Sequence, residues 1–329
     1  MQKRHGSALG ATLLMMLLTC AVKPAHAAMV LTAAGTSAGF TLSTFASGFS
    51  SDGGGVGPVG ITFPNSGGVL VTDFPSGSVY FFPTDTDGQS TASITPVTGF
   101  GTNNGAGLTN FNGTVYLAEQ ARGAIVQLTD TGSLVSTLTA GTPLATDLVG
   151  NSANGLLYVS HGGISAVNPT TKSVTSVLSG VASDGLTLDA LNQILYAEVN
   201  GQIVGYNIGN ASVAFQSGAI SGADGAALGQ GTLAGNLFVN TNFGQIVEVN
   251  LATKAQTVIA TGGSRGDLIA LDPNGTLLLT QTDSVIRLSP PSGGSFGGSA
   301  TPEPATTALT LAGVTGLLGL ARRRKKRSS

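Results

Sequence analysis

The chain is poor in cysteine, tryptophan and charge. Its 329 residues include one cysteine and no tryptophan, and only 9% of them are charged. The single cysteine, Cys20, lies in an apolar stretch near the start, so the rest of the chain has no thiol and cannot form a disulfide. The body must therefore be stabilised by burial and hydrogen bonding alone, and about 270 residues are ample for one large core.

Basic residues are scarce away from the two ends of the chain. Between residues 28 and 301 there are five cations against fifteen carboxylates, which gives a net charge near −10. The five cations are Arg122, Lys172, Lys254, Arg265 and Arg287. A body this acidic argues against nucleic acid or an anionic lipid surface as a partner. Low charge and abundant Gly, Ser and Thr suit an extracellular all-β protein with many short turns.

The first 27 residues have the organisation of a secretory signal peptide. They contain a positively charged start with Lys3 and Arg4, an apolar run from Leu9 to Ala21, and the small-residue cleavage site Ala25-His26-Ala27. Cleavage after Ala27 would remove Cys20 as well. The alternative is lipoprotein processing, in which Cys20 becomes the lipidated N-terminus, although Thr19 stands where a smaller residue is usual.

The end of the chain combines three short elements. Pro302-Glu303-Pro304 is followed by an uncharged apolar run, residues 305–321, and then by six consecutive cations. These cations are Arg322, Arg323, Arg324, Lys325, Lys326 and Arg327. As a helix the apolar run would rise about 25 Å, the low end of what crosses a bilayer, and the cations would hold that end in the cytoplasm. A buried helix or a basic nucleic-acid tail would not explain why the charges adjoin an uncharged run.

This tail resembles the PEP-CTERM sorting signal of bacterial exported proteins. The resemblance implies a sorting signal over residues 302–329, with a transmembrane helix at 305–321 and a basic tail at 322–327. It also implies processing at Pro302-Glu303-Pro304 by an exosortase-type enzyme, followed by release or attachment to surface polysaccharide. The protein would be exported through the inner membrane to the cell envelope or beyond, with its C-terminus cytoplasmic before processing.

An internal repeat runs through the body. Its most apolar short runs are centred on Leu70, Tyr116, Tyr158, Tyr196, Phe238 and Leu278, at spacings of 46, 42, 38, 42 and 40 residues. Each run is too short for a helix, and a second β-rich segment follows it after a polar turn. A further strand precedes each run and, in most repeats, a fourth follows. Four antiparallel strands in about 40 residues are typical of a β-propeller blade.

The sequence therefore predicts an all-β body, a six-bladed propeller over residues 40–290. The sixth repeat has three strands, and the segment Phe40–Phe45 is expected to supply its fourth and close the ring. Residues 28–39 are expected to be flexible, and residues 291–301 to form a Gly/Pro/Ser linker. An open solenoid or sandwich is the alternative, and a seventh blade stays open if residues 85–104 contain further strands.

Two strand-turn-strand segments carry a second resemblance. Residues 151–159, with Asn154-Gly155, and residues 271–278, with Asn274-Gly275, resemble the repeats of NHL-type and gluconolactonase-like propellers. The resemblance covers residues 39–290 and implies the fold more than an activity, because such propellers include enzymes, scaffolds and ligand binders.

Four aspartates recur near the start of the first strand in repeats three to six. They are Asp147, Asp184, Asp224 and Asp267. Converging at one mouth of the channel, they could bind a hard cation such as Ca²⁺, and gluconolactonase-like enzymes hold a divalent metal in that region. Alternatively, each carboxylate accepts hydrogen bonds from nearby backbone. The equivalent positions of the first two repeats, Val59-Gly60 and Ala106-Gly107, offer no ligand.

His161 is the one histidine between the two terminal signals, and streptogramin-lyase-like propellers use a histidine as general base. It lies in the turn between the second and third strands of repeat three, which we expect to be remote from the blade-connecting loops. Two functional hypotheses follow. The first is a non-enzymatic envelope or matrix protein that requires no cofactor, and the second is an exported metal-dependent hydrolase or lyase that uses the aspartates.

Overall fold

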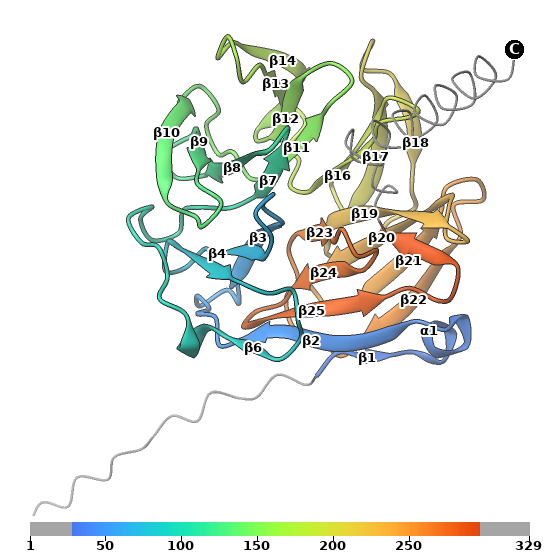
Figure 1. Cartoon of the computed structure of the whole chain (residues 1–329). Helices are drawn as coiled ribbons and strands as arrows, with labels where there is room; N and C mark the ends of the chain where they lie inside the picture. The colour runs from blue at the N-terminus through green and yellow to red at the C-terminus, as the bar shows by residue number, and fades with distance from the viewer. Residues whose placement is uncertain (1–27, 297–329) are drawn as a thin grey trace, which may run out of the picture.

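The computed structural model describes residues 28–296, and these fold into a closed ring of six β-sheets (Figure 1). The predicted signal peptide, the sorting motif, the apolar run and the basic tail lie outside the described residues. Within the described part, no helix is both long and apolar enough to cross a membrane. The fold is therefore an all-β, six-bladed propeller, as the repeat predicted.

Blades 1 to 3 follow the predicted order of strands from the channel outward. Their strands are β3 (Pro58–Thr62), β4 (Val69–Asp73) and β5 (Ser78–Phe82); β7 (Leu108–Phe111), β8 (Thr114–Glu119), β9 (Ala124–Leu128) and β10 (Leu134–Thr139); and β11 (Leu148–Asn151), β12 (Leu156–Ser160), β13 (Gly163–Val167) and β14 (Val174–Ser179). Blade 1 has three strands, and Val97 forms a single antiparallel bridge to Val79 where a fourth would lie.

Blades 4 to 6 complete the ring. Their strands are β15 (Leu186–Asp189), β16 (Ile194–Val199), β17 (Gln202–Asn207) and β18 (Val213–Gln216); β19 (Ala223–Gly231), β20 (Asn236–Thr241), β21 (Ile246–Asn250) and β22 (Gln256–Thr261); and β23 (Ile269–Leu271), β24 (Leu277–Thr280) and β25 (Ser284–Ser289). The first strands β3, β7, β11, β15, β19 and β23 contact one another in a closed circle around the axis.

The N-terminal strand closes the last blade. β2 (Thr41–Ser47) pairs antiparallel with β25, in the register Leu42↔Leu288 and Thr44↔Ile286 (Figure 1). Residues 85–104 contain β6 (Gln89–Ser90), which runs parallel to β2, a 3₁₀ turn at Thr91–Ser93, and the single bridge of Val97 to blade 1. They do not form a seventh blade, because β6 extends the sheet of the closing strand and Val97 adds to the edge of blade 1.

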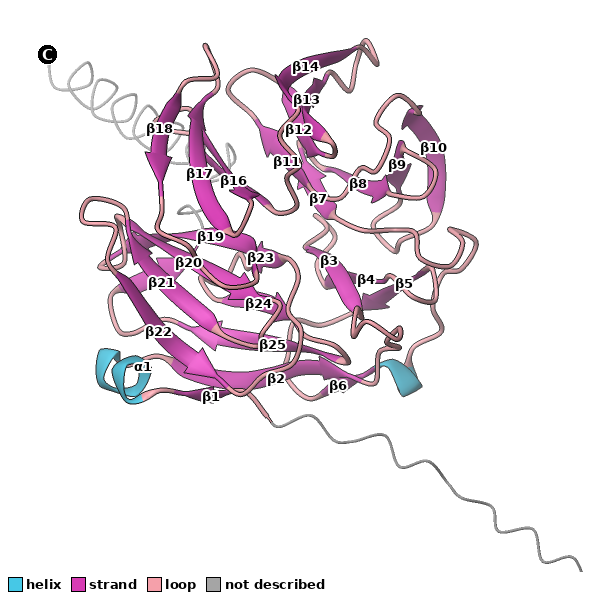
Figure 2. Cartoon of the chain, turned by 180° about the vertical axis from the view of Figure 1, so that it is seen from behind, coloured by secondary structure: helices cyan, strands magenta, loops and turns pink. Residues whose placement is uncertain are grey.

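Residues 28–39 differ from the flexible segment expected from the sequence. β1 (Val30–Leu31) pairs with the outer edge of β22, and the short helix α1 (Ala33–Ala38) follows it (Figure 2). The Thr32 side chain caps α1 by accepting from the Gly35 N–H, and Gly39 ends the helix with a φ of 89°. Because Met29 is buried and β1 covers an otherwise open sheet edge, this segment has partners that its composition did not reveal.

The expected linker also begins later than residue 291. β26 (Gly294–Phe296) pairs with the Gly229–Gly231 end of β19, and the Phe296 side chain is 1% exposed. Its ring meets that of Phe238 edge to face at 4.8 Å between centroids. Burial of the Phe296 side chain holds this segment against the ring. The flanking Gly, Ser and Pro residues did not indicate that contact, so the sequence predicted a linker there.

The core is divided among the joints between blades. Each pair of neighbouring blades encloses one cluster of buried apolar side chains, and Phe40 and Phe296 join the cluster between blades 5 and 6. At some positions near the axis, neighbouring first strands approach too closely to leave room for a Cβ atom. A Cβ on Gly225 would lie 2.7 Å from the Leu268 Cα of the next blade. Glycine at this position therefore lets the ring contract around a narrow channel.

Candidate functional site at the channel mouth

The four predicted aspartates lie around the channel, but they do not form one equivalent ring. The charge of Asp267 raises the pKa of Asp184, and the charges of both raise the pKa of Asp224. Asp147 belongs to blade 3, and among the other three aspartates only Asp184, in the neighbouring blade 4, raises its pKa. The structure thus brings three of the four predicted residues together.

Asp147 joins two blades through the backbone. Its Oδ1 accepts from the Leu148 N–H and its Oδ2 from the Leu186 N–H of blade 4, both at 2.8 Å. Burial raises the pKa of Asp147 to about 7, and the two N–H donors partly offset that effect. Both oxygens are therefore engaged in holding blade 3 against blade 4.

Asp267 forms an ion pair with Arg265. The guanidinium donates from Nη2 to Oδ1 at 2.7 Å, and its Nε donates to both carboxylate oxygens at 3.1 and 3.3 Å. Burial raises the pKa of Asp267, while Arg265 opposes that rise. Arg265 is a residue of the site that the sequence analysis missed, although it is one of five body cations and lies two residues before Asp267.

Asp224 is almost completely buried, with 1% of its surface exposed. Its Oδ2 accepts from the Asn242 Nδ2 at 3.2 Å, whereas its Oδ1 has no hydrogen-bond partner among residues 28–296. Burial, followed by the charges of Asp184 and Asp267, raises the pKa of Asp224 well above its ordinary value. Both causes disfavour the charged form of this carboxyl relative to that of an exposed aspartate.

Asp184 is the carboxylate most open to a ligand. Among the described residues, none donates a hydrogen bond to its side chain, and it lines two adjoining pockets. Burial and the charges of Asp267 and Glu198 raise the pKa of Asp184 to about 6. Glu198 was not predicted. Its Oε1 accepts from the Gly201 N–H at 2.6 Å, and burial raises its pKa too.

The donor arrangement does not fit a shared Ca²⁺ site. No group of three or more His, Cys, Asp or Glu side chains in residues 28–296 is placed to hold a metal ion. Both carboxylate oxygens of Asp147 already accept hydrogen bonds from backbone N–H groups, and Arg265 already supplies the positive charge beside Asp267. Ca²⁺ prefers six to eight oxygen ligands, which the remaining Asp184 and Asp224 do not provide.

Two pockets occupy the channel mouth and share Gln120, Thr146 and Asp184. The central pocket, of about 130 Å³, lies over the axis and includes Arg265 and Asp267. The side pocket, of about 460 Å³, extends over blades 2 to 4. Its other lining residues are Leu144, His161, Gly162, Ala182, Ser183, Glu198 and Asn200.

The expectation that His161 lies away from the blade-connecting loops is wrong. It lines the side pocket with Ala182, Ser183 and Asp184 of the loop between blades 3 and 4, and the Ser183 N–H donates to its carbonyl at 3.4 Å. In a four-stranded antiparallel blade, the turn after the second strand lies at the same edge as the start of the first strand. His161 Nε2 lies 2.8 Å from Ser165 Oγ, and burial lowers the pKa of the imidazole.

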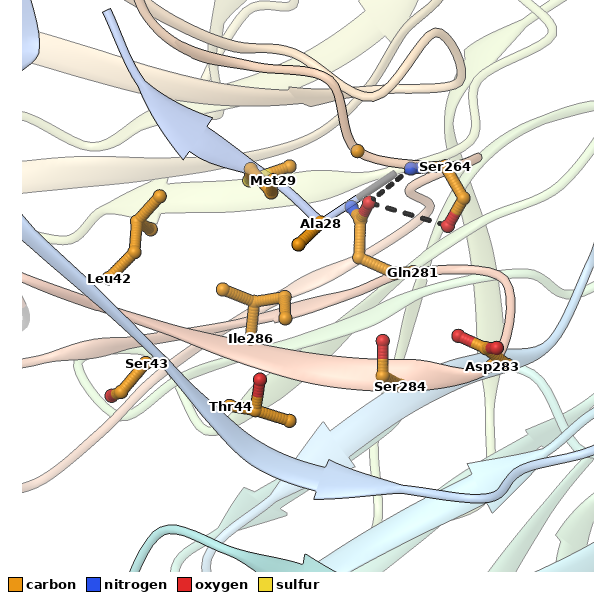
Figure 3. Close-up of a pocket in the computed structure, with 11 residues that line it drawn as sticks. Ala28, Met29, Leu42, Ser43, Thr44, Ser264, Gln281, Asp283, Ser284 and Ile286 are labelled. Atoms are coloured by element: carbon orange, nitrogen blue, oxygen red, sulfur yellow. Dashed lines mark hydrogen bonds between the residues drawn. The ribbon is translucent and has the colours of Figure 1, made fainter. Parts of the chain in front are cut away.

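Another pocket lies apart from the channel, where the N-terminal segment meets blades 5 and 6 (Figure 3). Ala28 and Met29 enter it beside Gln281, whose Oε1 accepts from the Ser264 N–H at 2.8 Å. Its volume is about 220 Å³. Because the predicted signal peptide ends at Ala27, the mature chain would begin at this pocket.

Comparison with known proteins identifies the tail and the fold. Residues 300–325 match the PEP-CTERM protein-sorting motif, which implies export, association with the envelope and involvement of an exosortase. No curated protein sequence matches the chain.

Solved structures similar to the body have low sequence identity to it. A gluconolactonase from Xanthomonas campestris is 14% identical, with a TM-score of 0.61 over 82% of this chain and 99% of that one. A luciferin-regenerating enzyme is 13% identical, with a TM-score of 0.58 over 79% and 99%. Virginiamycin B lyase from Staphylococcus aureus is 13% identical, with a TM-score of 0.52 over 76% and 99%. At these identities the likeness concerns the fold alone.

Proposed function

We propose that this chain is an exported surface protein, processed at its PEP-CTERM signal by an exosortase, whose propeller binds or scaffolds rather than catalyses. The observation that carries the proposal is the sorting motif at residues 300–325, which follows the last strand of the ring at Phe296 after only three residues. The whole folded ring therefore precedes the signal in the chain and would be exported as one unit.

The proposed route uses both ends of the chain. Signal peptide cleavage after Ala27 leaves Ala28 at the start of the mature protein, and the apolar run 305–321 holds the precursor in the membrane with the basic tail in the cytoplasm. Processing near Pro304 then releases the propeller or transfers it to surface polysaccharide. The absence of cysteine from residues 28–329 is compatible with export, since no disulfide has to form.

The non-enzymatic role is supported by how the carboxylates are used. Asp147 is held by two backbone donors, Asp267 by Arg265, and the buried Glu119 by Arg122 at 2.9 Å. The central pocket of about 130 Å³ is smaller than the few hundred Å³ typical of small-molecule sites. These features favour carboxylates that already have structural partners within the fold.

The alternative is an exported metal-dependent lactonase, hydrolase or lyase. One observation favours it, namely that the side pocket places His161 and Asp184 in one cavity of about 460 Å³. Calorimetry with millimolar Ca²⁺ on the purified chain, compared with the Asp184→Ala/Asp224→Ala variant, tests this alternative. Binding that the double variant abolishes would support the metal site that this alternative requires, and no binding would remove it.

The sorting proposal is tested by deleting Pro302-Glu303-Pro304 in the native host. We expect the deletion variant to stay in the membrane with its C-terminus intact, while the wild-type chain is shortened and reaches the surface. A matched control replaces the three residues Gly297-Gly298-Ser299, which precede the motif, with alanines and should be processed normally. Unchanged processing of the deletion variant would contradict the proposal.

A further inference from the structure

The direction of the strands gives the ring two distinct sides. Neighbouring strands of a blade are antiparallel, and every first strand begins at the channel mouth. The turns after the first and third strands therefore lie at the opposite side, which we call the exit side. In blades 5 and 6 it includes the turns at residues 232–235 and 272–276.

The described chain ends at the exit side. β26 pairs with Gly229–Gly231, the end of β19 that is farthest from the mouth. The Thr232 N–H donates to the Gly293 carbonyl at 3.1 Å, and the Phe296 N–H donates to the Gly275 carbonyl at 3.0 Å. Thr232 and Gly275 belong to the two exit-side turns. Because the Phe296 side chain is also buried, the point from which the sorting signal continues is fixed at this side.

The remaining tether is too short to reach the mouth. The apolar run of the signal begins nine residues after Phe296, and nine extended residues span at most about 32 Å. Neighbouring blades cover both faces of blade 5, so a chain that reached the mouth would pass around its outer edge. That path crosses four strand spacings from β26 to β22, about 19 Å, and then the six residues of β22, about 20 Å more.

The charges of the two sides favour the same arrangement. Lys172 and Lys254 are the two lysines of the described residues, and both are exposed in turns on the exit side. Neither forms an ion pair within residues 28–296. The two cations on the mouth side, Arg122 and Arg265, are already paired with carboxylates. An anionic lipid surface would therefore attract the exit side more than the mouth side.

We propose that the exit side of the ring faces the membrane that holds the precursor, and that the channel mouth faces outward. This inference rests on the proposed function, because the anchor is the apolar run of the sorting signal. The short tether sets the orientation, and the exposed lysines add to it. A partner outside the cell would then meet the mouth and its two pockets, while the exit side meets lipid headgroups.

The test measures how far each side lies from a membrane. Gly162→Cys, in the turn after β12, labels the mouth side, and Gly209→Cys, in the turn after β17, labels the exit side. Both glycines are exposed, and an added Cβ would meet no atom within 4 Å at either position. Each variant is made in a Cys20→Ser chain, so that the introduced cysteine is its single thiol.

The full chain, with its tail intact, is labelled with a donor fluorophore and reconstituted into phosphatidylcholine vesicles that carry an acceptor on their headgroups. These vesicles have no net charge, so the tether acts alone. We expect stronger energy transfer from the label at residue 209, which should lie about 20 Å nearer the headgroups than the label at residue 162. Equal transfer, or stronger transfer from residue 162, would overturn the inference.

A lengthened tether is the matched control. About thirty Gly and Ser residues inserted between Ser299 and Ala300 let the tether reach either side of the ring, so the difference between the two labels should largely disappear. A difference that survives the insertion would show that the short tether does not set the orientation. Intact mass of the chain from its native host tests processing separately, so the orientation and the proposed function can fail independently.

Discussion

Removing the guanidinium of Arg287 should be among the most damaging single changes to the ring. Arg287 lies on β25 with 7% of its side chain exposed, and it forms ion pairs with Asp85, Asp87 and Asp272. Asp272 belongs to blade 6, whereas Asp85 and Asp87 belong to the loop that leaves blade 1. Ser43 of β2 donates to Asp87 at 2.6 Å, so the cluster also holds the closing strand.

The expected magnitude follows from the exposure of each partner. The Asp272 side chain is 1% exposed and that of Asp85 is 26% exposed, so Arg287→Ala would leave a buried charge without a partner. Breaking such a pair costs about 3–5 kcal/mol. Asp87, at 39%, is exposed enough for solvent to screen its pair, so it adds little. At about 2–4 °C per kcal/mol for a domain of this size, the melting temperature should fall by about 6–20 °C.

Thermal unfolding of the full chain in detergent, followed by circular dichroism at pH 7.5, measures this loss. Lys254→Gln, an exposed change of one charge, is the control and should shift the melting temperature by less than about 2 °C. Because burial raises the pKa of Asp85 to about 6, the deficit of Arg287→Ala should shrink below pH 6 as the Asp85 carboxyl takes up a proton. A loss below about 1 kcal/mol at pH 7.5 would refute the role of Arg287 in closure.

Three further changes test the ring, the tail and the buried aspartates. Gly225→Ala should destabilise the fold by several kcal/mol, because its Cβ would meet Leu268 backbone at 2.7 Å, whereas Gly53→Ala, with open space around it, should be tolerated in the same melts. Phe296→Ala should weaken docking of β26 by about 3 kcal/mol, seen as about 100-fold faster hydrogen exchange at residues 229–231. Burial raises the pKa of Asp147 from 3.8 to about 7, so its contribution to stability declines as pH rises from about 4 to about 7. The melting temperature should therefore fall across that window, and a rise would contradict the raised pKa.

The repeat made the fold predictable because each blade buries the same kind of strand. The apolar runs centred on Tyr116, Tyr158 and Phe238 became β8, β12 and β20, since a short continuous apolar run between turns is typical of a buried strand. Closure by the N-terminal strand followed from counting, because the sixth repeat lacked one strand. Docking of Phe296 was not predictable, because a lone aromatic in a Gly/Ser/Pro segment does not specify its partner.

The site was predictable only in part. The recurring position of Asp184, Asp224 and Asp267 indicated that they converge, and their charge coupling agrees with this. What each carboxylate does depends on long-range neighbours: Arg265 beside Asp267, and the Leu186 N–H beside Asp147. The location of His161 could have been predicted from the sequence. Because successive strands of a blade run in opposite directions, the turn after the second strand lies at the edge where the first strand begins, which is the channel mouth.

The most direct test of the central claim is the intact mass of the protein recovered from the envelope and medium of its native host. An exported, exosortase-processed surface protein predicts a chain that begins at Ala28 and ends near Pro304, with or without added sugar. A mature chain that still carries residues 305–329 would contradict processing at the motif and leave a membrane-held propeller in its place.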